Sequence, residues 1–229
     1  MIAPALFVTL GVTLANRAGI LNSGVTVLDY PLSVFLGTLI WQVFAEAVDI
    51  GHQAFDSARS YITRVYFSRA AIVLTQFYES LITTFIRLSI LLLMLTFSQG
   101  IDLQAVSWIS LCFICALLLG MGIGTVLMPF TLLFSDLHQS LKLFLNYGLF
   151  LTPAFYSPAE NGLFAEVINC NPVTPLIIAA REAAIGSASI QTSQLWIILA
   201  LAFGLTIFGL VMLRMVAPII IERMLMGGR

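Results

Sequence analysis

The chain has 229 residues, of which 60% are hydrophobic and only 9% are charged, and its net charge is −1. A soluble domain carries about 25% charged residues, so a chain this apolar cannot cover a water-facing surface and requires lipid around it. Neither the composition nor the charge suggests a nucleic-acid-binding protein. The composition therefore predicts an integral membrane protein.

Six apolar runs predict an all-α, polytopic bundle of six transmembrane helices in one domain over residues 1–229, because a spanning helix needs about 20 apolar residues. The first run is short, and we expect the native span to begin upstream of Met1. The fourth run carries Gly120, Gly122 and Gly124, small residues that allow neighbouring helices to approach closely. The six runs cover residues 2–15, 31–48, 71–97, 106–134, 143–156 and 195–213.

The intervals between the runs differ in character. Residues 49–69 are amphipathic and basic, which is typical either of an interfacial helix on anionic lipid or of a docking helix for a partner protein. Residues 135–142 form a short polar break. Residues 158–194 form the longest polar interval, and a short helix expected over 173–184 predicts a re-entrant or interfacial hairpin there. Residues 214–226 are expected to form an interfacial tail.

Basic residues are unevenly divided between the two sides of the predicted bundle. Short cytoplasmic loops of multi-pass proteins are enriched in lysine and arginine. With both termini inside, the external segments hold only Arg17 and Arg181. This favours a multi-pass protein of the inner (cytoplasmic) membrane with both termini in the cytoplasm. The basic residues on the cytoplasmic side are Arg59, Arg64, Arg69, Lys142, Arg214, Arg223 and Arg229.

Two ionisable residues, Glu79 and Arg87, lie inside the third predicted span. Such a side chain at mid-bilayer costs about 2.5–3.5 kcal/mol on insertion scales, so it usually faces protein or a wet cavity. The two lie about 12 Å apart along a helix and cannot pair directly on it. Two interpretations stay open at this point: a polar strip that lines a pathway, or packing against other helices.

Motifs for catalysis and metal binding are missing from the sequence. There is no Walker-type phosphate loop, zinc-protease motif or nucleophile elbow, so this chain is expected neither to bind ATP nor to be an enzyme. Cys112 and Cys115 lie in an apolar run and are interpreted as small buried residues. His52 and His138 have no cluster of ligating residues around them, so a metal site is not expected. If the chain takes part in active transport, the energy must come from another subunit or from an ion gradient.

Four segments carry a shared pattern. Residues 61–69 resemble L-I-x-K-V-Y-F-P-R with Ser68 in place of the proline, and residues 149–157 resemble F-L-S-P-V-F-Y-P. The segment before 149–157 resembles R-D-L, with Ser135 where arginine is common. The other matching positions are Tyr30, Pro31, Phe35, Gly37, Trp41, Phe44, Asp136, Leu137, Asn171, Pro172, Pro175 and Arg181. In order and spacing the pattern resembles the membrane subunits of type-2 ABC exporters, especially those for polysaccharides such as O-antigen or teichoic acid.

The resemblance implies the partners of the chain. Two copies would work with two ATP-binding subunits, which hold ATP and Mg²⁺, to move a lipid-linked polysaccharide outward through the membrane. Residues 49–69 would contain the coupling helix that contacts the ATP-binding subunit. The residues implied in or beside that contact are Arg59, Arg64, Tyr66, Phe67 and Arg69.

The resemblance also implies where the substrate passes. The pathway would lie between the two copies, and residues 158–194 would form short external helices with the family residues Asn171, Pro172 and Arg181. The candidate lining residues are Trp41, Tyr147, Phe155 and Tyr156.

Two alternatives stay open. Within the same family, the substrate could instead be a drug, haem or a lipid. From another class, an ion-coupled secondary transporter or a channel would use Glu79 and Arg87. Many secondary transporters are built from two similar halves, and the sequence shows no clear half-to-half repeat.

Overall fold

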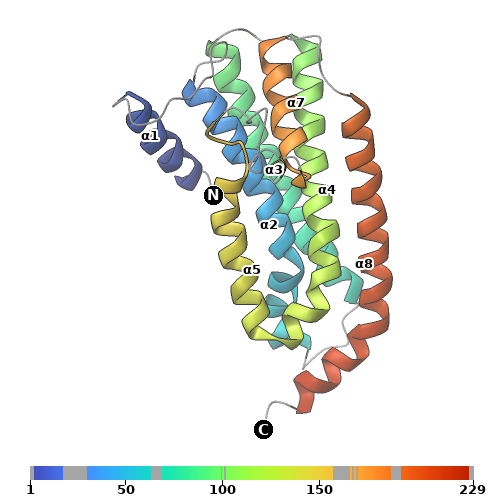
Figure 1. Ribbon diagram of the computed structural model, residues 1–229. Coiled ribbons are helices and arrows are strands. Elements are labelled where there is room, and N and C mark those ends of the chain that lie inside the picture. Colours follow the sequence, from blue (N-terminus) through green and yellow to red (C-terminus); the bar gives the residue numbers. More distant parts are fainter. Residues whose placement is uncertain are drawn as a thin grey trace.

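The computed structural model describes residues 3–17, 30–62, 69–98, 100, 102–156, 166, 168, 170–186 and 192–226. Every regular element in these ranges is a helix, which confirms the all-α prediction (Figure 1). The elements are α1 (Ala3–Arg17), α2 (Tyr30–Ile62), α3 (Arg69–Ser98), α4 (Leu103–Leu133), α5 (Ser135–Gly148), the 3-10 turn η1 (Leu149–Leu151), α7 (Thr174–Ile185) and α8 (Thr192–Met226).

Four of the helices are long and apolar enough to cross a bilayer. They correspond to the second, third, fourth and sixth predicted runs, and α1 carries a shorter apolar stretch. The chain therefore has the helices of a membrane protein. The four long stretches are Tyr30–Asp49 in α2, Phe77–Ser98 in α3, Leu103–Thr131 in α4 and Ser193–Met212 in α8.

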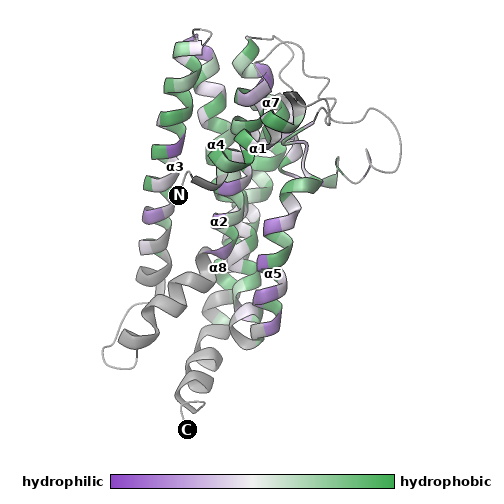
Figure 2. Cartoon of the chain, turned by 90° about the vertical axis from the view of Figure 1, so that its left-hand side faces the viewer, coloured by the Kyte–Doolittle hydropathy of each residue, from purple (hydrophilic) through white to green (hydrophobic). Residues whose placement is uncertain are grey.

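The region of the fifth predicted run is built differently from the prediction. α5 begins at Ser135, inside the predicted polar break, and ends at Gly148. Its buried positions, among them His138 and Leu145, recur at helical spacing. The exposed positions carry polar residues and also large apolar ones such as Leu143 and Phe144, so hydrophilic and hydrophobic residues both occur along the helix (Figure 2). The helical stretch ends where Pro153 follows, because the residue before a proline prefers the extended backbone seen there (φ −96°, ψ 146°).

Two helices extend well beyond their apolar stretches. α2 continues as a helix to Ile62, so the first part of the predicted coupling segment continues the second span without a break. Residues 63–68 of that segment lie outside the described residues. α8 continues to Met226, so the predicted interfacial tail is a helix that extends the last span.

The centre of the bundle is formed by α2 and α4. Most of the apolar stretch of each is buried, whereas α3 and α8 leave most of theirs exposed. α3 packs against α2, α8 packs along α4, and α7 lies against α4 and α2 at one end of the bundle (Figure 1). The large apolar faces that α3 and α8 expose are the surfaces expected to contact lipid.

Glycines bring α2 and α4 very close together. A Cβ atom on Gly120 would lie 2.5 Å from the carbonyl oxygen of Phe44, and one on Gly124 would collide with the carbonyl oxygen of Val48. Gly122 faces the other way, toward α8. These contacts confirm the prediction that the small residues of this span allow close helix approach.

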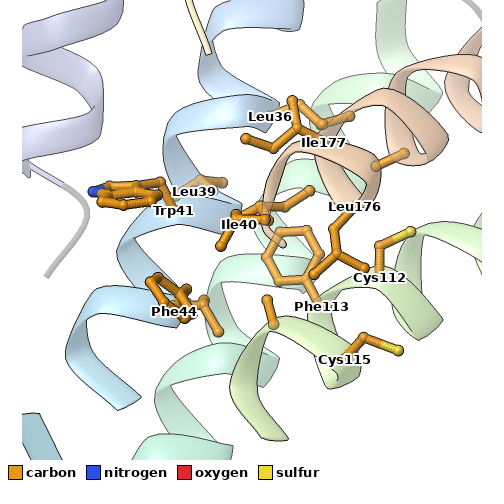
Figure 3. Close-up of a cluster of buried hydrophobic side chains, with 14 of the residues drawn as sticks. Leu36, Leu39, Ile40, Trp41, Phe44, Cys112, Phe113, Cys115, Leu176 and Ile177 are labelled. Atoms are coloured by element: carbon orange, nitrogen blue, oxygen red, sulfur yellow. The ribbon is translucent and has the colours of Figure 1, made fainter. Parts of the chain in front are cut away.

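A core of apolar side chains joins α2, α4 and α7. Figure 3 shows Phe113 of α4 against Ile40 of α2 and Leu176 of α7. Cys112 and Cys115 lie on α4 in the same core, and both are buried free thiols. Their interpretation as small buried residues is confirmed. The core anchors α7, which carries Arg181, the central residue of the site described next.

Candidate functional site

Arg181 joins three parts of the chain that are far apart in the sequence. The residue is partly buried on α7, and its guanidinium donates hydrogen bonds to the carbonyl oxygens of Ala154 (2.6 Å), Tyr156 (3.3 Å) and Ser33 (3.4 Å). One guanidinium can serve several acceptors because it carries five N–H donors in a planar fork. Arg181 therefore ties α7 to the turn after η1 and to the start of α2.

Two further contacts hold the same place. The hydroxyl of Tyr30 donates a hydrogen bond of 3.1 Å to the carbonyl oxygen of Phe155. Gly37 lies so close to the turn that a Cβ atom on it would be 3.0 Å from the Cα of Ala154, so a side chain there would push the turn away. We call this cluster the Arg181 junction; its members are Tyr30, Ser33, Gly37, Ala154, Phe155, Tyr156 and Arg181.

Local turn chemistry sets the position of α7. The side-chain oxygen of Asn171 accepts a hydrogen bond of 3.0 Å from the backbone N–H of Val173, an Asx turn that reverses the chain before the helix. Pro175 lies in the first turn of α7, where its missing N–H costs nothing. Gly186 ends the helix with a left-handed backbone (φ +72°). The short helix predicted over 173–184 is thereby confirmed.

The junction keeps its positive charge at neutral pH. Burial lowers the pKa of Arg181 from 12.5 to about 10, and the nearby Tyr30 partly offsets this effect. The guanidinium therefore stays protonated, and its hydrogen bonds to the three carbonyl oxygens are charge-assisted. Burial also raises the pKa of the adjacent Glu182 carboxyl. With carbonyl groups as its partners, Arg181 acts as a structural joint.

The Arg181 junction gathers positions from three of the four segments that resemble type-2 ABC exporters. No family model and no curated protein matches this chain. The interpretation of the junction therefore depends on its contacts and on the residues that form it.

The four residues expected along an export pathway differ in exposure. Trp41 is buried, and its indole N–H donates a hydrogen bond of 3.0 Å to the carbonyl oxygen of Leu145. Phe155 is buried within the Arg181 junction, and Tyr156 is partly exposed. Tyr147 is exposed on the outer face of α5. Their role in a pathway between two copies stays a prediction.

Arg87 has an ion-pair partner that the sequence analysis missed. Its Nη2 lies 2.5 Å from Oε1 of Glu46 on α2, with Arg87 1% exposed and Glu46 49% exposed. A paired charge can be buried at bilayer depth at lower cost than a lone one. For Arg87, this fits packing against another helix, whereas Glu79 is exposed on α3. The sequence did hold a signal, since Glu46 is an acidic residue inside an apolar run.

A second polar cluster, also missed, joins α2 to α5. Oδ1 of Asp49 lies 3.5 Å from Nδ1 of His138, and Oδ2 of Asp49 lies 3.9 Å from Nζ of Lys142. Asp49 and His138 are buried, and Lys142 is half exposed. Across the described ranges, no group of three metal-ligating side chains comes together. The cluster is therefore a polar contact between two helices.

The predicted contact with an ATP-binding subunit is only partly covered by the structure. Arg64, Tyr66 and Phe67 lie outside the described residues. Arg59 belongs to the last turns of α2, and Arg69 is the first residue of α3. Arg59 and Arg69 are thus on the helices that contain the second and third predicted spans.

Proposed function

We propose that this chain is the membrane subunit of a type-2 ABC exporter that moves a lipid-linked polysaccharide from the cytoplasmic side to the outer side. The observation that carries the proposal is the Arg181 junction. Segments 30–37, 154–156 and 171–181 each match the exporter pattern, and side chains of two of them hydrogen-bond across the junction. Matches that arose by chance would be scattered over the bundle, whereas these form one unit.

In this proposal all six apolar runs lie in the bilayer, with α1 and α5 adding to the four long helices. Both termini are cytoplasmic, so the Arg181 junction lies at the outer side and Asp49 lies toward the cytoplasm. The division of basic residues supports this orientation. Asn146 and Tyr147 are exposed on α5. Lipid tails offer no hydrogen-bond partner to the amide side chain of Asn146, so this face of α5 is expected to contact protein or water. Two copies of the chain around a pathway would provide such surroundings.

Two ATP-binding subunits would supply the energy and would hold ATP and Mg²⁺. Their contact would be formed by Arg59, Arg64, Tyr66, Phe67 and Arg69. Because α2 runs unbroken from Tyr30 to Ile62, force on its cytoplasmic end would reach the Arg181 junction through one helix. ATP binding would shift the bundle between two states to the extent that the ATP-bound subunits bind one state more tightly.

Co-purification from the native membrane tests this assignment. The tagged full-length chain, extracted in mild detergent, is expected to retain an ATP-binding subunit in equal amount. Phe67→Ala should weaken that association, whereas Phe85→Ala, on the exposed face of α3, should not. Wild-type protein that retains no ATP-binding subunit contradicts the proposal. Equal retention by the two variants contradicts only the docking role of Phe67.

A further inference from the structure

A cavity of about 380 Å³ lies between α2, α4 and α5 and is open on one side. Trp41 and Phe44 line it, and Figure 3 shows both leaving α2 on the side opposite Phe113. Ile123 of α4 and Phe144 of α5 complete the main walls. A cavity of this size falls in the range of about 300–1,000 Å³ that is usual for small-ligand sites.

The walls of the cavity are suited to hydrocarbon. Trp41 presents only its apolar ring surface, because its N–H is satisfied by the carbonyl oxygen of Leu145. Gly148 makes room for this ring, since a Cβ atom there would lie 2.7 Å from Cζ2 of Trp41. The cavity is therefore shaped by residue choice on two helices and is lined almost entirely by carbon.

The cavity also lies at the depth of the bilayer. Its lining residues on α2 and α4 belong to the stretches Tyr30–Asp49 and Leu103–Thr131, which are long and apolar enough to span. Water does not stably fill an apolar cavity. Within a bilayer, an opening between apolar stretches of spanning length would face hydrocarbon. A lipid chain both matches the walls and is present at the opening.

Charge marks one end of the cavity. Val48 and Leu141 line this end, and the residues that follow them, Asp49 and Lys142, approach to 3.9 Å between α2 and α5. Asp49 is the last residue of the apolar stretch of α2, so Lys142 lies where hydrocarbon gives way to lipid headgroups. The Lys142 side chain is 54% exposed. Its ammonium has three donors, and lysine binds phosphate as a point charge.

We infer that this cavity is a binding site for a phospholipid of the surrounding bilayer. One acyl chain lies between Trp41 and Phe144, and the phosphate lies at the exposed side of Lys142, with Asp49 beneath it. The site belongs to the helix bundle itself and does not depend on the proposed export function. An occupied cavity would fill the space between α2 and α5 that the protein itself leaves open.

Lys142 is the only lysine in the chain, so an amine-reactive reagent reports on it directly by peptide mapping. The full-length protein is purified in a neutral detergent and mixed with phosphatidylglycerol or with diacylglycerol of the same chains. At ten times its dissociation constant, phosphatidylglycerol should slow acylation of Lys142 about tenfold, and diacylglycerol should not. Equal rates with both lipids overturn the headgroup assignment.

A photoreactive phosphatidylglycerol with a diazirine in one acyl chain tests the cavity itself. Adducts are expected on Phe44, Ile123 and Phe144. Ile123→Trp fills the cavity and should remove most of these adducts, whereas the matched Ile114→Trp, on the exposed face of α4, should keep them. Adducts spread evenly over the exposed faces of α3 and α8 overturn the site. So does a disulfide between two Phe144→Cys chains without any lipid adduct, which would assign the cavity to a second copy.

Discussion

A nitrogen of the Arg181 guanidinium lies 2.6 Å from the carbonyl oxygen of Ala154, although 27 residues separate the two in the sequence. Ala154 belongs to the turn that follows α5 and η1, and Arg181 belongs to α7. The bond therefore links two buried elements that come before and after residues 157–165, which lie outside the described residues. Together with the bonds to Tyr156 and Ser33, and with the bond from Tyr30 to Phe155, it fixes the position of this turn.

Arg181→Ala should destabilise the folded protein by about 2 kcal/mol or more, because carbonyl oxygens lose their charged donor. Arg181→Lys should recover only part of the loss, since one ammonium cannot reproduce the planar fork that serves three acceptors. The measurement is the fraction that stays monodisperse after heating in detergent. Wild-type stability of Arg181→Ala would contradict the structural role of the junction.

The contribution of Arg181 should not change between pH 5 and 9. Burial lowers its pKa only to about 10, whereas the unfolded residue titrates near 12.5. The unfolded chain therefore binds more protons than the folded chain only at pH values between these two pKa values, where the free energy of unfolding rises with pH. At lower pH both states carry the proton, and the contribution of Arg181 to stability is constant. The stability difference between wild type and Arg181→Ala, followed from pH 5 to pH 9, should be flat. A steep change over that range would contradict this assignment.

Gly120→Ala should weaken the contact between α2 and α4 by about 1–3 kcal/mol, as overpacking of a close contact does. The added Cβ atom would meet the backbone of Phe44, which cannot move away as a flexible side chain could. Gly204→Ala is the matched control, because nothing lies within 4 Å of a Cβ atom there. It should leave the melting temperature unchanged or slightly raised. Equal losses in both variants would argue against the close packing described for Gly120.

Glu46→Gln should destabilise the protein by about 1–2 kcal/mol, because it leaves the buried guanidinium of Arg87 without its carboxylate. The loss is smaller than for a fully buried pair, since Glu46 is half exposed. The same substitution at Glu79, which is exposed on α3, should have little effect. Adding Arg87→Gln to Glu46→Gln should restore part of the stability in a double-mutant cycle. Independent, additive effects of the two changes would show that the pair is not energetically coupled.

Cys170 offers a direct test of orientation. It is exposed, whereas Cys112 and Cys115 are buried, so a membrane-impermeant maleimide reports on one residue. In the proposed orientation the reagent should label Cys170 in sealed cells, and Cys170→Ser should abolish the signal. Ser140→Cys, added to Cys170→Ser, should react only after the membrane is opened. Ser140 lies in the first half of α5, which packs near Asp49 of α2 and is cytoplasmic in the proposed orientation. The reverse pattern would invert the topology.

The long spans could be predicted from the sequence, because a helix that crosses the bilayer needs about 20 predominantly apolar residues. Residues 71–97 accordingly lie within α3, and all but the last residue of 106–134 lie within α4. α5 could not be placed by this criterion. Polar residues such as Asp136, Gln139 and Lys142 interrupt its apolar ones, so the predicted apolar run began at residue 143, after the helix had started, and continued past Gly148. Helical spacing of buried positions was the signal that would have placed it.

The polar contacts were harder to predict, and for a physical reason. Glu46 with Arg87, and Asp49 with His138, meet only because two helices pack in one particular register. Sequence patterns predict which residues share one face of a helix, but they do not predict which face of another helix packs against it. Arg181 was singled out because its position matches the pattern described in the sequence analysis. Its hydrogen-bond partners could not be predicted, because they are backbone carbonyl oxygens, which every residue carries.

We propose that the chain moves a lipid-linked polysaccharide outward using ATP. The most direct test reconstitutes the chain with its co-purified ATP-binding subunit in vesicles that carry the substrate, and measures how much glycan becomes accessible on the far side. Transfer should require ATP and Mg²⁺ and should be lost when the ATP-binding subunit is omitted. Transfer without ATP, or transfer driven by an imposed ion gradient alone, would contradict the proposal.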